Sequence, residues 1–202
     1  MLNTRILFTL VLCLMTLCQS LKAQIHTPFM PTASFSHITI EQGLSDNCIR
    51  ALAQDRKGFI WIGTDKGLNR YDGHSILNLS KANRLSVTCM QLDGDSLWLG
   101  TGNGLYLYSI RKDSLSPVQL HNEEEDLNGA NISDIKYDGT NNLWIATMGN
   151  GIIKMDTHTC EAQCIKTPHG EKLYGCVYID KRKRVWASSN WLKSNLILYN
   201  AQ

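Results

Sequence analysis

The cysteine and histidine residues between positions 158 and 169 are of the types that form zinc sites. Cys160 and Cys164 are flanked by His158 and His169, and thiolate and imidazole are common zinc ligands. If this segment is an extended strand, the two cysteine backbones lie roughly 13 Å apart. That separation exceeds the reach of a disulfide and of two thiolates on one zinc ion. Only a loop conformation would allow a metal site here, so no metal ligand is predicted.

The glycine-rich stretch 100–104, GTGNG, has the composition of a phosphate-binding loop. No Lys-Ser or Lys-Thr pair follows it and no helical pattern begins after it, so the helix N-terminus that would hold an anion is missing. The Asn-Gly pair recurs at Asn150-Gly151. This recurrence indicates hairpin turns, because Asn and Gly tolerate the positive φ that such turns require. No nucleotide or other cofactor is predicted.

Aspartate and histidine side chains supply no convincing general acid or base. A hydrolase or lyase needs carboxylates or a histidine that converge on one point. Each of four aspartates instead ends a short apolar segment, where its side chain can bond the backbone of a turn, and the histidines are scattered. These residues are Asp55, Asp93, Asp138 and Asp180, and His37, His74, His121, His158 and His169. No catalytic residue is predicted.

A motif that recurs four times organises the chain. Residues 59–73, FIWIGTDKGLNRYDG, read as two apolar runs joined by a Gly-bearing turn, which predicts a β-hairpin. Similar stretches lie at residues 97–105, 143–152 and, more weakly, 185–199. Their tryptophans are Trp61, Trp98, Trp144 and Trp186, at intervals of 37, 46 and 42 residues. Such intervals are typical of four-stranded propeller blades of about 40–50 residues.

The segments around each tryptophan complete a four-stranded unit. A short apolar strand ended by Asp precedes each Trp strand, and an aromatic strand and a variable fourth strand follow it. The predicted fold is therefore an all-β β-propeller of about four blades, each of four antiparallel strands. The predicted blades span residues 46–80, 86–120, 131–166 and 173–202.

The first repeat and its lead-in resemble a known family. Residues 35–45, 58–64 and 67–73 are similar to the two-component regulator propeller, the periplasmic sensor region of hybrid two-component systems of Bacteroides-type bacteria. The resemblance extends over about residues 35–200. It implies a ring of about seven blades in which residues 35–45 form a strand that closes the last blade. We therefore expect an incomplete ring, the N-terminal piece of a longer sensor.

The resemblance also bears on activity. In the family, a histidine kinase core and a receiver beyond the propellers perform the phosphorylation chemistry. This chain contains no match to the nucleotide-binding boxes of the kinase. The chain by itself is therefore predicted not to be an enzyme.

The first 23 residues have the features of a signal peptide. Arg5 supplies the positive start, residues 6–18 are apolar, and Ala23-Gln24 is a plausible cleavage point. The apolar run is shorter than the roughly 20 residues that span a membrane, although an uncleaved anchor is an alternative. We therefore predict a periplasmic protein, with residues 24–34 as a short linker.

Five cysteines remain after residue 23, and an odd number cannot all pair within one chain. They are Cys48, Cys89, Cys160, Cys164 and Cys176. Cys89 and Cys176 occupy equivalent places in the first strands of their blades, where Ala51 stands in the first blade. We interpret both as small apolar side chains near the propeller axis.

The charge of the chain does not suggest a nucleic-acid partner. The formal net charge is +2, and 43% of residues are hydrophobic, as in ordinary soluble proteins. The basic run 181–184 is predicted to be a solvated turn before the Trp186 strand. The acidic run 123–126 is predicted to be an exposed loop between two blades.

The resemblance implies that the chain senses an oligosaccharide or another small periplasmic ligand. Contacts are expected on inter-strand loops at one end of the propeller, such as those around Asn47, Thr88 or Asn131. Self-association is also expected, because the family forms dimers. Two alternatives stay open: a stand-alone exported propeller that binds a protein or glycan, and a propeller hydrolase or lyase.

Overall fold

The computed structural model describes residues 35–167, 170–189 and 196–200. The predicted signal peptide at 1–23 and the linker at 24–34 lie outside these residues. The chain divides into two compact units, Met1–Ser36 and His37–Gln202, and all that follows concerns the second. In the described residues no helix is long and apolar enough to cross a membrane.

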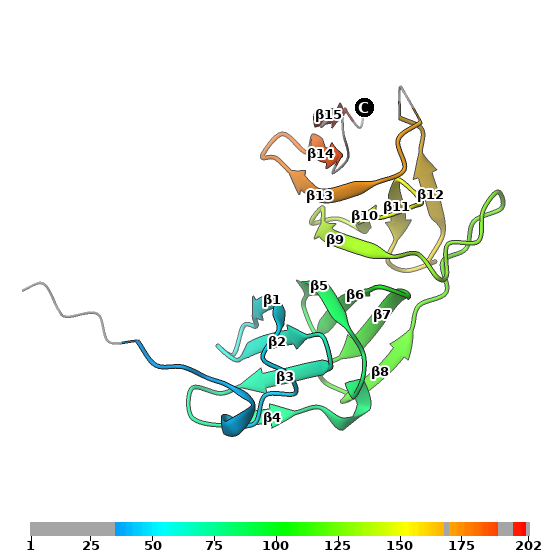
Figure 1. Ribbon diagram of the computed structural model, residues 1–202. Coiled ribbons are helices and arrows are strands. Elements are labelled where there is room, and N and C mark those ends of the chain that lie inside the picture. Colours follow the sequence, from blue (N-terminus) through cyan, green and yellow to red (C-terminus); the bar gives the residue numbers. More distant parts are fainter. Residues whose placement is uncertain (1–34, 168–169, 190–195, 201–202) are drawn as a thin grey trace, which may run out of the picture. The chain divides into compact units, whose positions relative to one another are not determined.

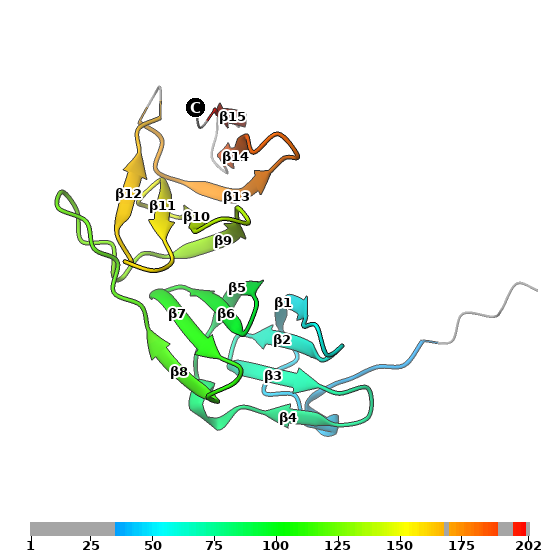
Figure 2. The same cartoon turned by 180° about the vertical axis from the view of Figure 1, so that it is seen from behind.

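The described strands form four antiparallel sheets that follow one another along the chain (Figures 1 and 2). The first sheet contains β1 (Ile49–Gln54), β2 (Ile60–Thr64), β3 (Gly67–Tyr71) and β4 (Ile76–Asn78). The second contains β5 (Val87–Asp93), β6 (Ser96–Thr101), β7 (Gly104–Ser109) and β8 (Ser114–Pro117). The third contains β9 (Ile132–Tyr137), β10 (Asn142–Thr147), β11 (Ile152–Asp156) and β12 (Ala162–Ile165). The fourth has three described strands, β13 (Tyr174–Ile179), β14 (Val185–Ser189) and β15 (Leu196–Tyr199).

This arrangement confirms the predicted all-β fold, an incomplete β-propeller. The first strands of consecutive blades lie side by side, β1 with β5, β5 with β9 and β9 with β13. Each predicted Trp strand is the second strand of its blade. In the fourth blade, the turn that the sequence left undefined, residues 190–195, lies outside the described residues.

The aspartate turns form as predicted, and in the first and fourth blades the aspartate also binds the tryptophan. Asp55 accepts hydrogen bonds from the backbone N–H groups of Lys57 and Phe59, and its second oxygen lies 2.9 Å from Trp61 Nε1. Asp180 makes the equivalent bond to Trp186 Nε1 at 3.1 Å. One carboxylate thus satisfies both a turn and a buried indole, an arrangement that the turn pattern alone did not reveal.

The second blade lacks this bond and has a shorter turn. Strand β5 ends at Asp93 and β6 begins at Ser96. Trp98 Nε1 is buried and has no hydrogen-bond partner among the described residues. An unpaired buried donor typically costs about 1–3 kcal/mol, so this blade carries a local energetic penalty.

A threonine closes the hairpin between the second and third strands in the first three blades. Thr101 Oγ1 donates to the Gly104 carbonyl at 2.7 Å and accepts from the Asn103 N–H at 3.1 Å. Thr64 and Thr147 donate to equivalent glycine carbonyls. The W-x-x-T pattern therefore pairs a core residue with a turn-forming residue three positions later.

We expect Thr101→Val to lower stability by about 1–2 kcal/mol, because the substitution keeps the shape of the side chain but removes both hydrogen bonds of a buried hydroxyl. The measurement is a thermal melt followed by far-UV circular dichroism. Thr101→Ser, which retains the hydroxyl, is the matched control and should lose less. A Thr101→Val variant as stable as the parent would show that the hairpin does not depend on this hydroxyl.

The blades pack face to face through small residues in the Trp strands. A Cβ atom added to Gly100 would lie 2.6 Å from Ile132 Cγ2 in the next blade, and one added to Gly63 would lie 2.7 Å from Val87 Cγ1. Ala146 stands at the equivalent place in the third blade and is fully buried against the fourth. The close approach of neighbouring sheets therefore depends on small residues at these positions.

A β-bulge occurs at the same place in the first strand of every blade. The register shifts around Arg50, Thr88, Ser133 and Gly175. Bulges re-aim side chains, and here two of them turn a hydroxyl toward the next blade. Thr88 Oγ1 donates to the Ile132 carbonyl at 2.6 Å, and Ser133 Oγ donates to the Tyr174 carbonyl at 2.5 Å.

The closing strand predicted at residues 35–45 stays a prediction, because the last blade that it would complete is not among the described sheets. The described part of this segment is irregular except for the short 3-10 helix η1 (Ile40–Gln42). A strand needs a neighbour to pair its backbone groups, and among the described strands none pairs with it. The segment instead fastens to the first blade, where Leu44 is buried and the Ser45 N–H donates to Asn69 Oδ1 at 2.9 Å.

Candidate functional site

One end of the blades collects the features that the sequence proposed for ligand contact. We call it the crossover end; it contains the turns between second and third strands, the segments that cross between blades, and the starts of the first strands. Asn47, Thr88 and Asn131 all lie there. The predicted loops therefore belong to one end of the propeller.

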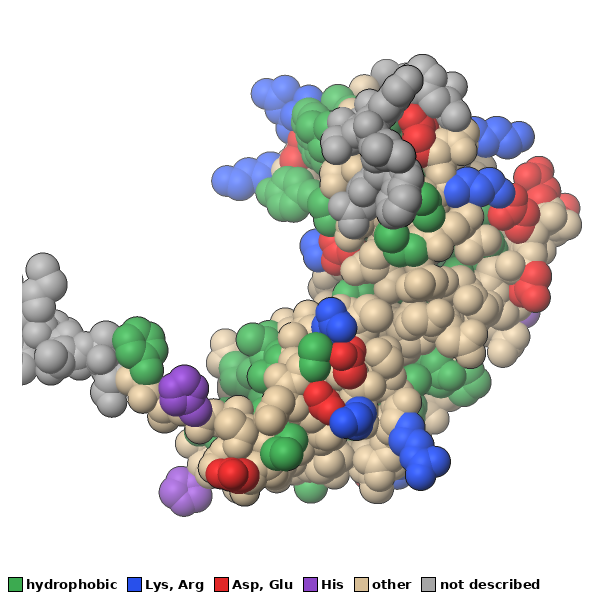
Figure 3. All heavy atoms as spheres, viewed as in Figure 1, with side chains coloured by type: hydrophobic (Ala, Val, Ile, Leu, Met, Phe, Trp, Pro, Cys, Tyr) green, Lys and Arg blue, Asp and Glu red, His purple; other side chains and the backbone are tan. Residues whose placement is uncertain are grey.

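Two ion pairs mark the crossover end of the first blade. Arg50 binds Asp65 through two nitrogens, at 2.9 and 3.1 Å, and Lys66 Nζ lies 2.6 Å from Asp46 Oδ2. Figure 3 shows basic and acidic side chains next to one another over the first two blades. The hydrogen bonds from Arg50 hold the pKa of Asp65 at about 2. These charged groups are therefore ionised at neutral pH and paired with one another.

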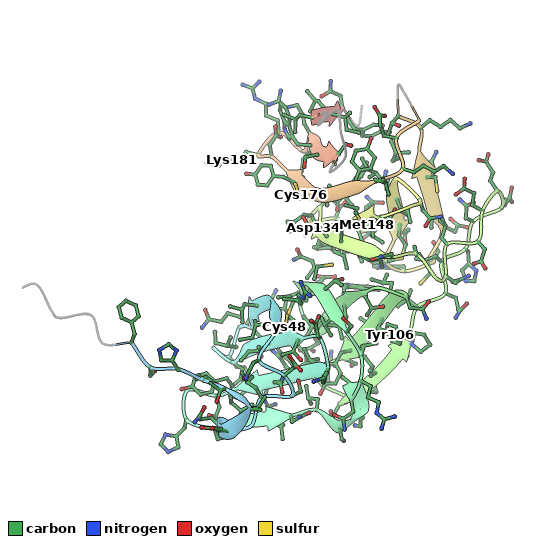
Figure 4. The ribbon with its side chains drawn as sticks, viewed as in Figure 1. Cys48, Tyr106, Asp134, Met148, Cys176 and Lys181 are labelled. Atoms are coloured by element: carbon green, nitrogen blue, oxygen red, sulfur yellow. The ribbon has the colours of Figure 1, made fainter. Side chains whose placement is uncertain are left out.

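The thiol beside these pairs is not an activated nucleophile. Cys48 is exposed at the start of β1 (Figure 4). Its hydrogen bond to Asp65 raises the pKa of the thiol above its usual value. A reactive cysteine needs a lowered pKa, so the surroundings of Cys48 favour the inert protonated form.

The side chains of the three predicted contact residues differ in whether they already make hydrogen bonds within the chain. The Asn47 side chain accepts from the Ile40 N–H at 3.0 Å, and the Thr88 hydroxyl bonds to the Ile132 carbonyl. The Asn131 side chain is exposed and makes no hydrogen bond within the described part of the chain. Its carbonyl accepts from the Met148 N–H at 2.8 Å, which fixes its backbone beside the turn after β10. Asn131 is thus held in place with a free amide.

The cysteine and histidine group considered for zinc is not assembled. Cys164 lies in β12, whereas Cys160 precedes that strand with a positive φ of 58°. His169 lies outside the described residues. Among the residues that the structure describes, no group of three or more His, Cys, Asp or Glu side chains could hold a metal ion.

Cysteine burial gives a chemical test of the blade packing. Cys89 is buried against the third blade, and burial raises the pKa of its thiol to about 12. Cys176, which we interpreted with Cys89 as a small apolar side chain near the propeller axis, is exposed, because no following blade covers it in the described residues.

We expect a water-soluble thiol reagent at pH 8 to modify the exposed Cys176 quickly, the exposed Cys48 more slowly because its pKa is raised, and Cys89 only after denaturation. Peptide mass mapping after timed labelling gives the order of reaction. Labelling in denaturant is the control, since all thiols should then react at similar rates. Rapid modification of Cys89 in the native chain would show that the second and third blades separate readily.

The opposite end, at the aspartate turns, holds a small cavity of 270 Å³. Asp55, Asp93 and Tyr137 line it, one from each of the first three blades. Asp55 is committed to its turn and to Trp61. Because the Asp55 carboxylate is fully hydrogen-bonded, Asp55 and Asp93 do not make an acid and base pair.

The basic run 181–184 forms the turn between β13 and β14, as predicted, with Lys181 at its tip (Figure 4).

The acidic run 123–126 lies in the exposed segment between β8 and β9, as predicted, but it also lines a groove of 1110 Å³ along β12. This segment pairs with the edge of β12, where the His121 N–H donates to the Cys160 carbonyl at 2.9 Å. Lys172 neutralises Glu125 at 3.4 Å. The groove was not foreseen, because nothing in the sequence indicates that a loop will cover a strand edge.

Known proteins share the repeat and the fold. Residues 43–66 match the family model described as two component regulator propeller. No curated protein matches the chain. The matched stretch contains Asp46, Arg50, Asp65 and Lys66, so it includes both ion pairs of the crossover end.

Solved structures with this fold include two of an extracellular domain from B. thetaiotaomicron. One, assigned to a one component system, is 21% identical over 82% of this chain, with a TM-score of 0.67. The other, assigned to a hybrid two component system, is 21% identical over 70%, with a TM-score of 0.59. This chain spans 23% and 19% of their lengths.

An enzyme also shares the fold. The catalytically inactive virginiamycin B lyase from Staphylococcus aureus is 14% identical over 76% of this chain and 56% of its own, with a TM-score of 0.58. At these identities the likeness concerns the fold alone, whereas the match at residues 43–66 concerns the family. The chain is thus an incomplete β-propeller whose residues 43–66 match the two component regulator propeller.

Proposed function

We propose that this chain is the sensor propeller segment of an exported two-component signalling protein. The match of residues 43–66 to the two component regulator propeller carries this proposal. The fold shared with extracellular domains of signalling systems supports a location outside the cytoplasm, as does the signal peptide expected at residues 1–23. Phosphorylation would belong to other parts of a longer protein.

The ligand proposed is a small periplasmic molecule, with an oligosaccharide as the first candidate. Sugar hydroxyls are bound by side chains that can both donate and accept hydrogen bonds, such as amides. The exposed amide of Asn131 at the crossover end has this chemistry and no competing partner among the described residues. We therefore assign Asn131, rather than Asn47 or Thr88, as a ligand contact.

Thermal melting of residues 24–202 with xylo-, arabino- and galacturono-oligosaccharides tests the binding. A ligand at one hundred times its Kd should stabilise the chain by about 2.7 kcal/mol, or roughly 5–10 °C for a domain of this size. Asn131→Ala should lose the shift. Asn141→Ala, an exposed asparagine at the opposite end, is the matched control and should keep it. A panel without any shift would count against an oligosaccharide sensor.

The same samples separate the alternatives. New reducing or unsaturated sugar ends after incubation would indicate a hydrolase or lyase, the reading that the lyase fold favours. Export is tested by expressing residues 1–202 and weighing the product released by osmotic shock, where loss of residues 1–23 is expected. Product retained in the cytoplasm with residues 1–23 intact would contradict an exported sensor.

A further inference from the structure

The segment between β8 and β9 forms a compact loop beside the outer strand of the third blade. Its ends meet where the Leu120 N–H donates to Asn128 Oδ1 at 2.7 Å. Leu120 and Leu127 anchor it, since both side chains are buried in the core between the second and third blades. The loop projects beside β12 in Figures 1 and 2. We call residues 120–128 the acidic loop, and compact loops closed in this way are frequently functional.

The acidic loop already pairs with one part of the outer edge of β12. The His121 N–H donates to the Cys160 carbonyl at 2.9 Å, and the His121 carbonyl accepts from the Ala162 N–H at 2.8 Å. Asn122 then ends the pairing. Its amide nitrogen donates to the Ala162 carbonyl, and its oxygen accepts from two backbone N–H groups of the acidic run, which turns the chain away. The edge therefore accepts a strand, but the loop covers only its first part.

The remaining part of the edge is open. In an antiparallel ladder, successive residues of a strand bond alternately to one side and to the other. Ala162 bonds outward to the loop, so Cys164, two residues further on, also presents its N–H and carbonyl outward rather than toward Ile153 on β11. No described residue hydrogen-bonds to these two groups. An unpaired edge of this kind is a template for another strand.

A groove of 1110 Å³ runs along this open edge. Apart from Tyr199, every described residue that lines it belongs to the acidic loop or to residues 161–166. Figure 3 shows acidic side chains gathered on the projecting loop. Five carboxylates line the groove, whereas Lys166 is its one lysine among the described residues. These carboxylates are Glu123, Glu124, Glu125, Asp126 and Glu161. The groove is therefore complementary in charge to a cationic partner.

Two of these carboxylates are free to bind a partner. Lys172 pairs with Glu125 at 3.4 Å, and Asp126 accepts hydrogen bonds from the Asn128 backbone and side chain. Glu123 and Glu124 are exposed and have no cationic partner within the described part of the chain. The charges also act on the edge itself. Burial raises the pKa of the Cys164 thiol, and the charges of Glu125 and Glu124 raise it further.

We infer that the open edge of β12 binds an extended segment of a partner protein that carries lysine or arginine side chains. The backbone of this segment pairs with Cys164, as His121 pairs with Ala162. Basic side chains at every second position lie on one face of such a strand, where they can meet Glu123 and Glu124. Main-chain pairing supplies affinity, and the charges select the partner. The inference does not rest on the sugar contact proposed at Asn131.

Fluorescence anisotropy of a labelled octapeptide of alternating lysine and threonine, titrated with residues 24–202 at low salt, tests the charge selection. The double variant Glu123→Gln/Glu124→Gln should bind about tenfold more weakly, because two exposed ion pairs are lost. Glu41→Gln/Asp95→Asn removes the same charge outside the groove and is the matched control, which should bind like the parent. Equal weakening in both double variants would mean attraction to net charge and would overturn the site.

A second comparison separates strand pairing from attraction between charges. Cys164→Pro removes the outward N–H while sparing the bonds to β11, so it should weaken binding about tenfold. Cys164→Ala keeps the N–H and is the matched control, and circular dichroism confirms that both variants are folded. An octapeptide of alternating lysine and proline carries the same charge but cannot pair as a strand, so it should bind the parent about tenfold more weakly. Equal affinity for the two peptides, or no binding of the lysine-threonine peptide at about 1 mM, would overturn the inference.

Discussion

Replacing Trp144 by alanine is expected to lower the free energy of unfolding by about 3–5 kcal/mol, the usual cost of removing a large buried aromatic side chain. Trp144 is 2% exposed and packs against Tyr174, Val177 and Val185 of the fourth blade. Its loss removes the centre of the interface between the third and fourth blades. Because repeat units derive much of their stability from their neighbours, the fourth blade should become unstable as well.

Trp186→Ala is the matched control for this experiment. Trp186 occupies the equivalent position, yet its face is partly exposed, so its replacement should cost less than half as much. Urea unfolding followed by far-UV circular dichroism avoids dependence on tryptophan fluorescence. Equal losses for both variants would mean that contact with a neighbouring blade does not determine the stability of these residues.

Adding a single methyl group at Gly100 is expected to destabilise the chain by about 1–3 kcal/mol. A Cβ atom there would lie 2.4 Å from Cys89 Sγ and 2.6 Å from Ile132 Cγ2. Neither atom can move freely, because Ile132 is fully buried and Cys89 nearly so. The Gly100→Ala variant must therefore push the second and third blades apart.

The glycine two residues later provides the control. Gly102 has no heavy atom within 4 Å of an added Cβ, so Gly102→Ala should change stability by no more than about 0.5 kcal/mol. Adding Cys89→Ala to Gly100→Ala should recover part of the loss, because it removes the nearer of the two atoms. A Gly100→Ala variant as stable as the parent in urea unfolding would show that the blades are not packed as closely as described.

The three expected contact residues show how much of a functional site local sequence can predict. Asn47, Thr88 and Asn131 were grouped because each lies near the start of a first strand, and the structure places all three at the crossover end. Which of them is free for a ligand could not be predicted. That depends on Ile40 and Ile132, whose backbone groups occupy the first two side chains.

Sequence alone determined the features that repeat along the chain. The Trp positions, the aspartate turns and the alternating apolar strands predicted the propeller, because strands and hairpin turns depend on residues close in sequence. The same reasoning placed the basic run in a turn and the acidic run between blades. Each of these predictions needs only the order of residue types within a few positions.

Only the tertiary structure decided what each repeated residue contacts. The bond from Asp55 to Trp61, the unpaired indole of Trp98 and the exposure of Leu52 and Leu196 all depend on the length of a turn or on the presence of a neighbouring blade. Residues 35–45 likewise pair with no described strand, since a strand there requires a partner edge. Contacts between sheets join residues that are far apart in the chain, and a local sequence pattern does not indicate which distant residues will meet.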